Sequence, residues 1–279
     1  MVKLGKYNRL AVVKNVDFGA YLDGGDGVEI LLPARYIGSP LQPGDEIEVF
    51  IYKDSEGRLI ATTEHPYVEV GQFAFLQVSA VNNVGAFLDW GLPTKELLVP
   101  YSEQKGKLRE GMIVPIYVYV DDATKRIVAS AKIEKYLGNS FPEFRQRQEV
   151  QALVYTRTEI GYKAVVNNLF SGMIYENEIY RPLEIGETVK AYVKNVRPDG
   201  KLDLTLSGTE NDRVNELAER IMDRLDREPD RFLPMGDFST PETIKEVFQC
   251  SKKDFKKAIG HLFRDHRITI SPAGIKKES

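Results

Sequence analysis

Apolar and polar residues alternate in short runs along about the first three quarters of the chain. Ile47, Val49 and Ile51 alternate with polar or aromatic neighbours, and the run 113–120 is rich in β-branched and aromatic residues. Turn residues separate these runs, as in the Gly-Gly-Asp-Gly segment 24–27. Period-two runs bounded by turn signals predict β-strands.

A segment around one glycine recurs three times, which indicates an internal repeat. The octad around Gly19 matches the octad around Gly85 closely, and a weaker copy surrounds Gly161. In each copy a second glycine follows 25 or 26 residues later, at Gly44, Gly111 and Gly186. About five short strands in ~65 residues fit a small closed β-barrel such as the OB-fold. The constant spacing predicts one structural unit used three times.

The segment from residue 209 onward changes to a helical period. Its apolar side chains fall on one helix face at positions 214, 217, 218, 221 and 225. Thr240 and Ser251 are typical N-cap residues and predict two further helices, with Phe263 among the inward side chains of the last. The run 268–270 and the Pro-Ala-Gly turn after it resemble a β-wing. Three helices and a hairpin predict a winged helix-turn-helix domain.

Together these patterns predict a mainly β protein of three tandem small β-barrels of the OB-fold, followed by an α+β winged helix-turn-helix domain. The expected boundaries place the barrels at residues 1–66, 67–138 and 139–208 and the winged helix at residues 209–279. No apolar run approaches the ~18 residues of a membrane-spanning helix, and the N-terminus lacks the apolar run of a secretion signal. We therefore expect no membrane partner and a cytoplasmic location.

The composition argues against several classes of function. Lys and Arg number 38 against 41 Asp and Glu, a net charge of −3, so bulk positive charge does not drive binding, although a local basic face remains open. With one cysteine and three histidines, we expect neither a disulfide framework nor a metal site, and no cofactor. No P-loop, GxSxG or HExxH pattern occurs, so we assign no catalytic residue and do not expect an enzyme.

Aromatic side chains flank the first repeated glycine. Phe18 and Tyr21 lie on the strand that belongs to the ligand-facing sheet of an OB barrel. Aromatic rings on that sheet stack on bases, and each stack contributes ~1–3 kcal/mol. The alternative is a structural role, because strand alternation points one side of each strand into the barrel. Trp90, the only tryptophan, is expected to serve packing or inter-domain contact.

The first repeat resembles the S1-type RNA-binding domain. The resemblance rests on the pattern Val-x-x-Phe-Gly-Ala-Tyr-Leu, on the Gly-Asp turn, and on a strand that ends Arg-Leu-Ile-Ala-Thr. In that family two aromatics, a histidine, an aspartate and an arginine form the RNA surface. By position, Phe18, Tyr21, Asp54 and Arg58 carry over, while Pro33 stands in place of the histidine.

The second repeat keeps part of the S1 pattern. Phe87, Asp122 and Arg126 match the second aromatic, the aspartate and the arginine. Val84 replaces the first aromatic and Pro100 replaces the histidine. The resemblance therefore implies that stacking in this repeat depends on Phe87 alone.

The third repeat departs furthest from the S1 pattern. Ile160 and Lys163 hold the aromatic positions, and Tyr175 holds the histidine position. Arg197 and Lys201 hold the positions of the aspartate and the arginine. The resemblance implies an RNA surface made of Lys163, Tyr175, Arg197 and Lys201, which is more cationic and stacks less.

The order of the modules is similar to that of the conserved virulence factor B family, bacterial proteins with three S1-type domains and a C-terminal winged helix that act as RNA-binding regulators. The resemblance spans nearly the whole chain. It implies a non-catalytic protein that binds single-stranded RNA and regulates gene expression after transcription.

The densest basic cluster lies in the predicted winged helix. The residues expected to contact nucleic acid there are Lys252, Lys253, Lys256, Lys257 and Arg267. Charge runs are also typical of solvated helix faces, and the segment from residue 209 has 14 basic and 14 acidic residues. Two alternatives therefore stay open: a duplex-DNA-binding transcription factor that acts through the winged helix, and an assembly factor that binds protein partners of the ribosome or polymerase machinery.

Overall fold

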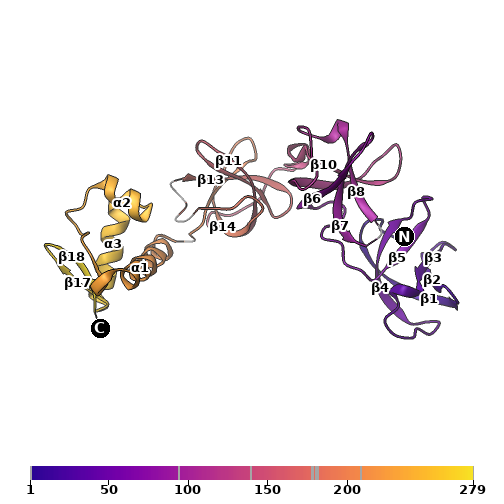
Figure 1. Ribbon diagram of the computed structural model, residues 1–279, viewed down its shortest axis with the longest axis horizontal. Coiled ribbons are helices and arrows are strands. Elements are labelled where there is room, and N and C mark those ends of the chain that lie inside the picture. The colour runs from indigo at the N-terminus through magenta and orange to yellow at the C-terminus, as the bar shows by residue number, and fades with distance from the viewer. Residues whose placement is uncertain are drawn as a thin grey trace. The chain divides into compact units, whose positions relative to one another are not determined.

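The computed structural model describes residues 2–93, 95–138, 140–176, 179, 182–207 and 209–278. The chain divides into two compact units, Met1–Tyr136 and Leu137–Ser279. The first unit contains two five-stranded sheets, and the second contains a third five-stranded sheet and a helical domain (Figure 1).

The first sheet, which we term barrel 1, closes on itself. Its strands are β1 (Tyr7–Val16), β2 (Gly19–Asp23), β3 (Glu29–Pro33), β4 (Glu46–Lys53) and β5 (Leu59–Thr62), with the short helix η1 (Ala34–Tyr36) after β3. The order around the barrel is β1-β2-β3-β5-β4, and a parallel pairing of β3 with β5 completes the closure. Alternate side chains such as Leu22 and Ile30 fill the interior.

The second sheet, barrel 2, repeats the strand order but lacks one pairing. Its strands are β6 (Phe73–Val81), β7 (Gly85–Leu92), β8 (Lys95–Pro100), β9 (Ile113–Val120) and β10 (Ile127–Ser130), with helices η2 (Tyr101–Glu103) and η3 (Ile133–Tyr136). The order is β10-β9-β6-β7-β8, and the described residues of β8 and β10 form no ladder pairs although the two strands lie in contact. Barrel 2 is therefore nearly closed, and β8 and β10 meet by contact rather than by ladder pairs among the described residues.

Barrel 3 is closed like barrel 1. Its strands are β11 (Glu149–Thr158), β12 (Gly161–Val166), β13 (Phe170–Tyr175), β14 (Thr188–Val196) and β15 (Leu202–Thr205). Three residue pairs join β13 and β15 in parallel, from Gly172 with Leu202 to Ile174 with Leu204.

The repeated glycines are required by the approach of the second strand to the third. A Cβ atom at Gly19 would lie 2.1 Å from the carbonyl oxygen of Leu32, and one at Gly161 would lie 2.1 Å from that of Ile174. Side-chain carbons do not approach backbone oxygens that closely, so only glycine fits. The close approach of the two strands therefore explains why glycine recurs at these positions, without any contact to a ligand.

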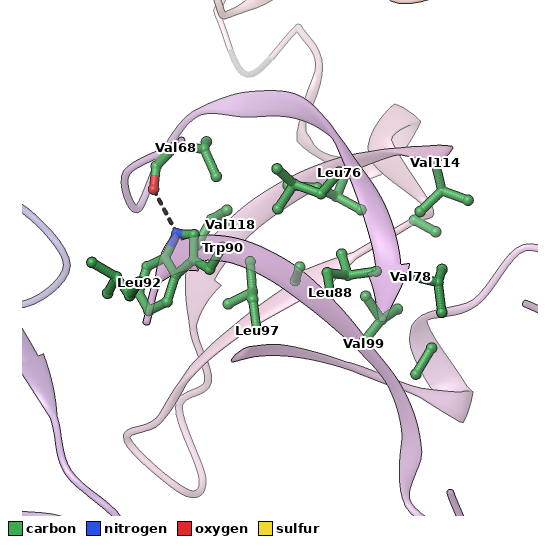
Figure 2. Close-up of a cluster of buried hydrophobic side chains, with 14 of the residues drawn as sticks. Val68, Leu76, Val78, Leu88, Trp90, Leu92, Leu97, Val99, Val114 and Val118 are labelled. Atoms are coloured by element: carbon green, nitrogen blue, oxygen red, sulfur yellow. Dashed lines mark hydrogen bonds between the residues drawn. The ribbon is translucent and has the colours of Figure 1, made fainter. Parts of the chain in front are cut away.

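A single apolar cluster joins barrels 1 and 2. Phe50, on β4, is fully buried and meets Trp90, on β7, edge to face at 5.6 Å between ring centroids. Figure 2 shows Trp90 among the buried side chains of barrel 2, with its indole N–H donated to the carbonyl oxygen of Val68 at 2.7 Å. The expected packing role of Trp90 is confirmed. The contact also makes the two barrels one packed body.

The C-terminal domain has the predicted helices and wing. Its elements are α1 (Glu210–Arg227), η5 (Pro229–Arg231), β16 (Phe232–Leu233), α2 (Pro241–Phe248), α3 (Lys252–Arg264), β17 (Ile268–Ser271) and β18 (Gly274–Lys277). The Thr240 and Ser251 side chains cap α2 and α3 as predicted. The two-residue strand β16 was not predicted, and it adds an edge to the wing in the order β16-β18-β17.

One expected core residue of this domain lies outside the core. The buried side chains of α3 are Phe255, Ala258, Ile259 and Leu262, whereas Phe263 is 53% exposed. The prediction for Phe263 was wrong because the inward stripe ends at Leu262, and the next position lies about 100° further around the helix.

The fold prediction of three small barrels and a winged helix is confirmed, whereas the ranges of the four domains remain a prediction. Within the described part of the chain, no helix is long and apolar enough to cross a membrane.

The interior of barrel 1 is a separate cluster, but the cluster around Phe50 and Trp90 joins barrel 1 to barrel 2. We therefore expect a substitution that destabilises barrel 1 to destabilise barrel 2 as well. Leu22→Ala, in the interior of barrel 1, should lower the free energy of unfolding by about 2–5 kcal/mol. The change should appear in denaturant unfolding followed by the fluorescence of Trp90, which reports on barrel 2. Val166→Ala, in the core of barrel 3, should not change the denaturant midpoint of the Trp90 transition. An unchanged Trp90 transition in Leu22→Ala would mean that the barrels unfold independently.

Candidate nucleic-acid interface

Two aromatic rings and a lysine form an open surface on barrel 1. Phe18 is 58% exposed, and its ring meets that of half-buried Tyr21 at 6.3 Å and 85°. The β1–β2 register places Lys14 opposite Tyr21, with its ammonium nitrogen 4.9 Å from the ring centroid and also paired with Glu29 at 2.6 Å. We term this the barrel-1 face. The sequence analysis did not identify Lys14 as a site residue. Pairing the residues on either side of the β1–β2 turn would have placed Lys14 opposite Tyr21.

The predicted pair Asp54 and Arg58 borders this face in the β4–β5 hairpin. One Asp54 oxygen accepts the backbone N–H groups of Glu56 and Arg58, both at 2.9 Å, and the other accepts the Arg58 Nε–H at 2.9 Å. A second carboxylate, that of Glu56, lies 2.9 Å from the Arg58 guanidinium. Partial burial would raise the pKa of Asp54, but the hydrogen bonds and charge of Arg58 hold that pKa below its ordinary value. Asp54 therefore positions Arg58 and partly neutralises it.

Barrel 2 differs from barrel 1 at the same hairpin. The backbone N–H of Asp121 is donated to the carbonyl oxygen of Arg126, as that of Asp54 is to Arg58, so Asp121 occupies the position that the sequence assigned to Asp122. The assignment was shifted because the β9–β10 turn is one residue longer, with Lys125 at φ 54°. Asp122 points to solvent, and its nearest cation is Lys125 at 3.6 Å.

The Asp121 carboxylate is turned away from Arg126. Its Oδ1 accepts both the backbone N–H and the hydroxyl of Thr124, each at 2.7 Å. These hydrogen bonds hold the pKa of Asp121 below its ordinary value. Among the residues that the structure describes, Arg126 therefore has no carboxylate ion-pair partner of the kind that Arg58 has in barrel 1.

Phe87 and Arg126 line a cavity of about 240 Å³ within the first unit. One wall is the β4–β5 hairpin of barrel 1, from Tyr52 to Gly57, which includes Asp54. The other walls come from β7, β8 and β10 of barrel 2 and include Lys95, which sequence reasoning missed. The structure therefore brings predicted residues of two repeats to one place.

In barrel 3 the predicted residues form an internal network. The Arg197 guanidinium donates to the Tyr175 hydroxyl at 2.5 Å and to Asp203 at 2.7 Å. The hydrogen bond to Asp203 raises the pKa of Arg197 despite its partial burial. Lys201 instead pairs with Asp199 at 2.7 Å, and half-buried Lys163 lies on β12 opposite Met173. Tyr175 and Arg197 are thus joined, whereas Lys201 is engaged elsewhere.

The predicted basic residues of the winged helix differ in their exposure and in their ion pairs. Lys253 and Lys256 are exposed on α3, and Lys256 lies 3.4 Å from Asp237. Lys252 and Lys257 are half-buried. Arg267 makes two hydrogen bonds to Glu219 of α1, at 2.5 and 3.0 Å. This ion pair fastens the start of the wing to α1.

Other chemistry has little support in the described residues. No three His, Cys, Asp or Glu side chains there gather in a way that could hold a metal ion. Cys250 precedes α3, but burial raises the pKa of its thiol to about 11, which opposes the reactive thiolate.

Comparison with known proteins identifies both kinds of domain. A family model described as an S1 domain matches residues 4–64, and one described as a CvfB-like winged helix domain matches residues 219–276.

Relatives of similar length cover most of the chain. A "Conserved virulence factor B" of Staphylococcus saprophyticus is 29% identical over 264 residues, 91% of this chain and 87% of that protein. Its namesake in Staphylococcus aureus USA300 is 28% identical over 84% of this chain and 80% of that protein. A crystal structure described as a multidomain protein with nucleic acid binding domains, from Streptococcus pneumoniae, is 25% identical, covers 99% of this chain and 98% of its own, and has a TM-score of 0.44.

The ion pair on the barrel-1 face predicts a titration behaviour. In Arg58→Gln the pKa of Asp54 should rise toward its ordinary value of 3.8, as measured by carboxyl NMR. The pKa of Asp121, which is lowered mainly by Thr124, should stay unchanged and is the internal control.

A lowered folded-state pKa contributes stability above the ordinary pKa and loses it as pH falls through the folded value. The stability of Arg58→Gln should therefore depend less on pH below about pH 4 than that of the unsubstituted protein. An Asp54 pKa that does not move in the variant would show that the ion pair is absent in solution.

Proposed function

Because the chain belongs to the conserved virulence factor B family, we propose that it binds single-stranded RNA through the faces of its barrels and regulates gene expression after transcription. The proposed role is binding without catalysis. The observation that carries it is the barrel-1 face, where exposed Phe18 and half-buried Tyr21 lie together, with Lys14 and Arg58 close to Tyr21.

The geometry of this face suits unstacked bases. A ring that is 58% exposed, as Phe18 is, leaves much apolar surface in water, and a base that stacks on it removes that surface. Bases offer their flat faces only where they are not stacked in a duplex, so the site favours single strands. Lys14 and Arg58 lie at its edges, where the backbone phosphates of a stacked strand can pass.

The charge of the protein limits how such binding works. With a net charge of −3, and with Lys14 and Arg58 already paired to carboxylates, only a few phosphates can be neutralised. Affinity then depends on stacking more than on counterion release, and its salt dependence should be shallow. Several barrels on one strand raise the affinity by effective concentration.

A duplex-DNA function through the winged helix has less support. The two cations best defined on that surface, Lys256 and Arg267, are both paired with acidic residues of the same domain. Binding of DNA phosphates there would first have to break these pairs.

The double variant Phe18→Ala, Tyr21→Ala tests the proposal. At ~1–3 kcal/mol per stack, affinity for labelled single-stranded RNA should fall by about tenfold or more in fluorescence anisotropy. Tyr67→Ala is the matched control, because Tyr67 is 66% exposed but lies against Gly91, away from this face.

Single-stranded DNA and duplex DNA are titrated in parallel at two salt concentrations. Unchanged RNA affinity in the double variant, or tightest binding to duplex DNA, would contradict the proposal.

A further inference from the structure

We propose that the cavity between the β4–β5 hairpin and barrel 2 is a nucleotide pocket, in which Lys95 and Arg126 hold a phosphate and Phe87 contacts the base. This inference rests on the proposed binding of single-stranded RNA and deepens it. It adds a residue, Lys95, and a composite site that needs both barrels.

The pocket lies along the seam between β8 and β10 of barrel 2. Lys95 and Leu98 come from β8, Val128 comes from β10, and Arg126 directly precedes β10. Among the described residues, these two strands lie in contact but form no ladder pairs with each other. In barrels 1 and 3 the corresponding strands are paired in parallel. In barrel 2 the side chains along this seam border the cavity.

The cations Lys53, Lys95 and Arg126 line this pocket. Along the stretches that the structure describes, neither the Lys95 ammonium nor the Arg126 guanidinium forms an ion pair with an acidic side chain. The carboxylates in or near the pocket wall make hydrogen bonds to other residues. Asp121 binds Thr124, Asp54 binds Arg58, and Glu96 accepts the hydroxyl of Ser79.

The surroundings of Lys95 favour an added anion. Partial burial lowers the pKa of Lys95, and the charge of Arg126 lowers it further, against an opposing effect of Asp54. Both causes work against a positive charge that lacks a partner. A phosphate placed between the two cations would relieve both, and charge-assisted hydrogen bonds to phosphate are among the stronger contacts in proteins.

The lining also has an apolar part, which comes mainly from barrel 2. Phe87 and Leu98 face each other across β7 and β8, and Val84 is 50% exposed beside them. The volume of about 240 Å³ is below the roughly 300–1,000 Å³ of sites for drug-sized ligands, so the pocket has no room for more than one nucleotide.

Trp90 provides a reporter inside the site. It is the only tryptophan, it lines the cavity, and it is 1% exposed. Ligand entry should therefore change its fluorescence, whereas binding at the barrel-1 face alone should not. The two sites can be followed separately in one sample of the full chain.

The test combines Trp90 fluorescence with RNA anisotropy in the full chain. Lys95→Gln should weaken binding of a single-stranded RNA oligonucleotide about tenfold, reduce the slope of log affinity against log salt by roughly 0.7, and abolish the Trp90 response. Arg126→Gln should do the same. Lys107→Gln is the matched control, because it removes one exposed lysine charge from barrel 2 outside the pocket.

Each outcome separates the pocket from the general function. If the unsubstituted protein binds RNA but Lys95→Gln is no worse than Lys107→Gln, the pocket is wrong and the proposed function stands. If the unsubstituted protein does not bind RNA, both fall. Adenosine or uridine monophosphate that binds as tightly as the oligonucleotide would also overturn the proposal, because the pocket would then recognise a free nucleotide. Identical unfolding transitions in all variants confirm that the comparison reports binding.

Discussion

The edge-to-face contact between Phe50 and Trp90 is the constraint on which the packing of barrels 1 and 2 within the first unit depends. It places an aromatic side chain from the outer side of barrel 1 in the same buried cluster as the core of barrel 2. Secondary contacts follow from it: Val70 donates its backbone N–H to the carbonyl oxygen of Gly5, and the Tyr7 hydroxyl bonds to His65. Because an aromatic pair in a close-packed core has few alternative arrangements, the β4–β5 hairpin is held in one position over barrel 2. The composite pocket exists only because of that position.

The hairpin between the fourth and fifth strands recurs in all three barrels, but its charged side chains have different partners in each. In barrel 1 an aspartate before the turn holds an arginine after it. In barrel 2 the aspartate binds Thr124, and Arg126 forms no ion pair with any acidic side chain that the structure describes. In barrel 3 the arginine itself stands before the turn, and it is held by Asp203 and Tyr175. A common backbone therefore carries a stacking surface, a cationic pocket and a closed polar network, which is how repeated domains acquire different binding properties without a change of fold.

Local patterns predicted the parts of the molecule that depend on local physics. Glycine at each close strand approach, Thr240 and Ser251 as caps, and the apolar stripe of α1 were all readable because neighbours along the chain decide them. The incorrect or missing predictions depended on the exact length of a turn or on contacts between residues far apart in the sequence. A turn longer by one residue moved the aspartate position from Asp122 to Asp121. Lys95 carries no motif, and its importance comes from a hairpin of another barrel. No sequence pattern shows which barrel surfaces pack against each other.

The arrangement of the first unit bears on how a protein of nearly neutral charge could hold RNA. Two modest sites, the barrel-1 face and the pocket of barrel 2, lie on one packed body, so a strand that occupies the first has the second within reach. The entropy that is lost when two binding sites are fixed relative to each other is then lost during folding and not during binding. Asp54 lies between the two sites, where it holds Arg58 at the first and forms part of the wall of the second. The Asp54 carboxylate repels any phosphate of a bound strand that does not lie beside one of the cations of the two sites. Such a layout favours correctly placed single strands over general attraction to polyanions.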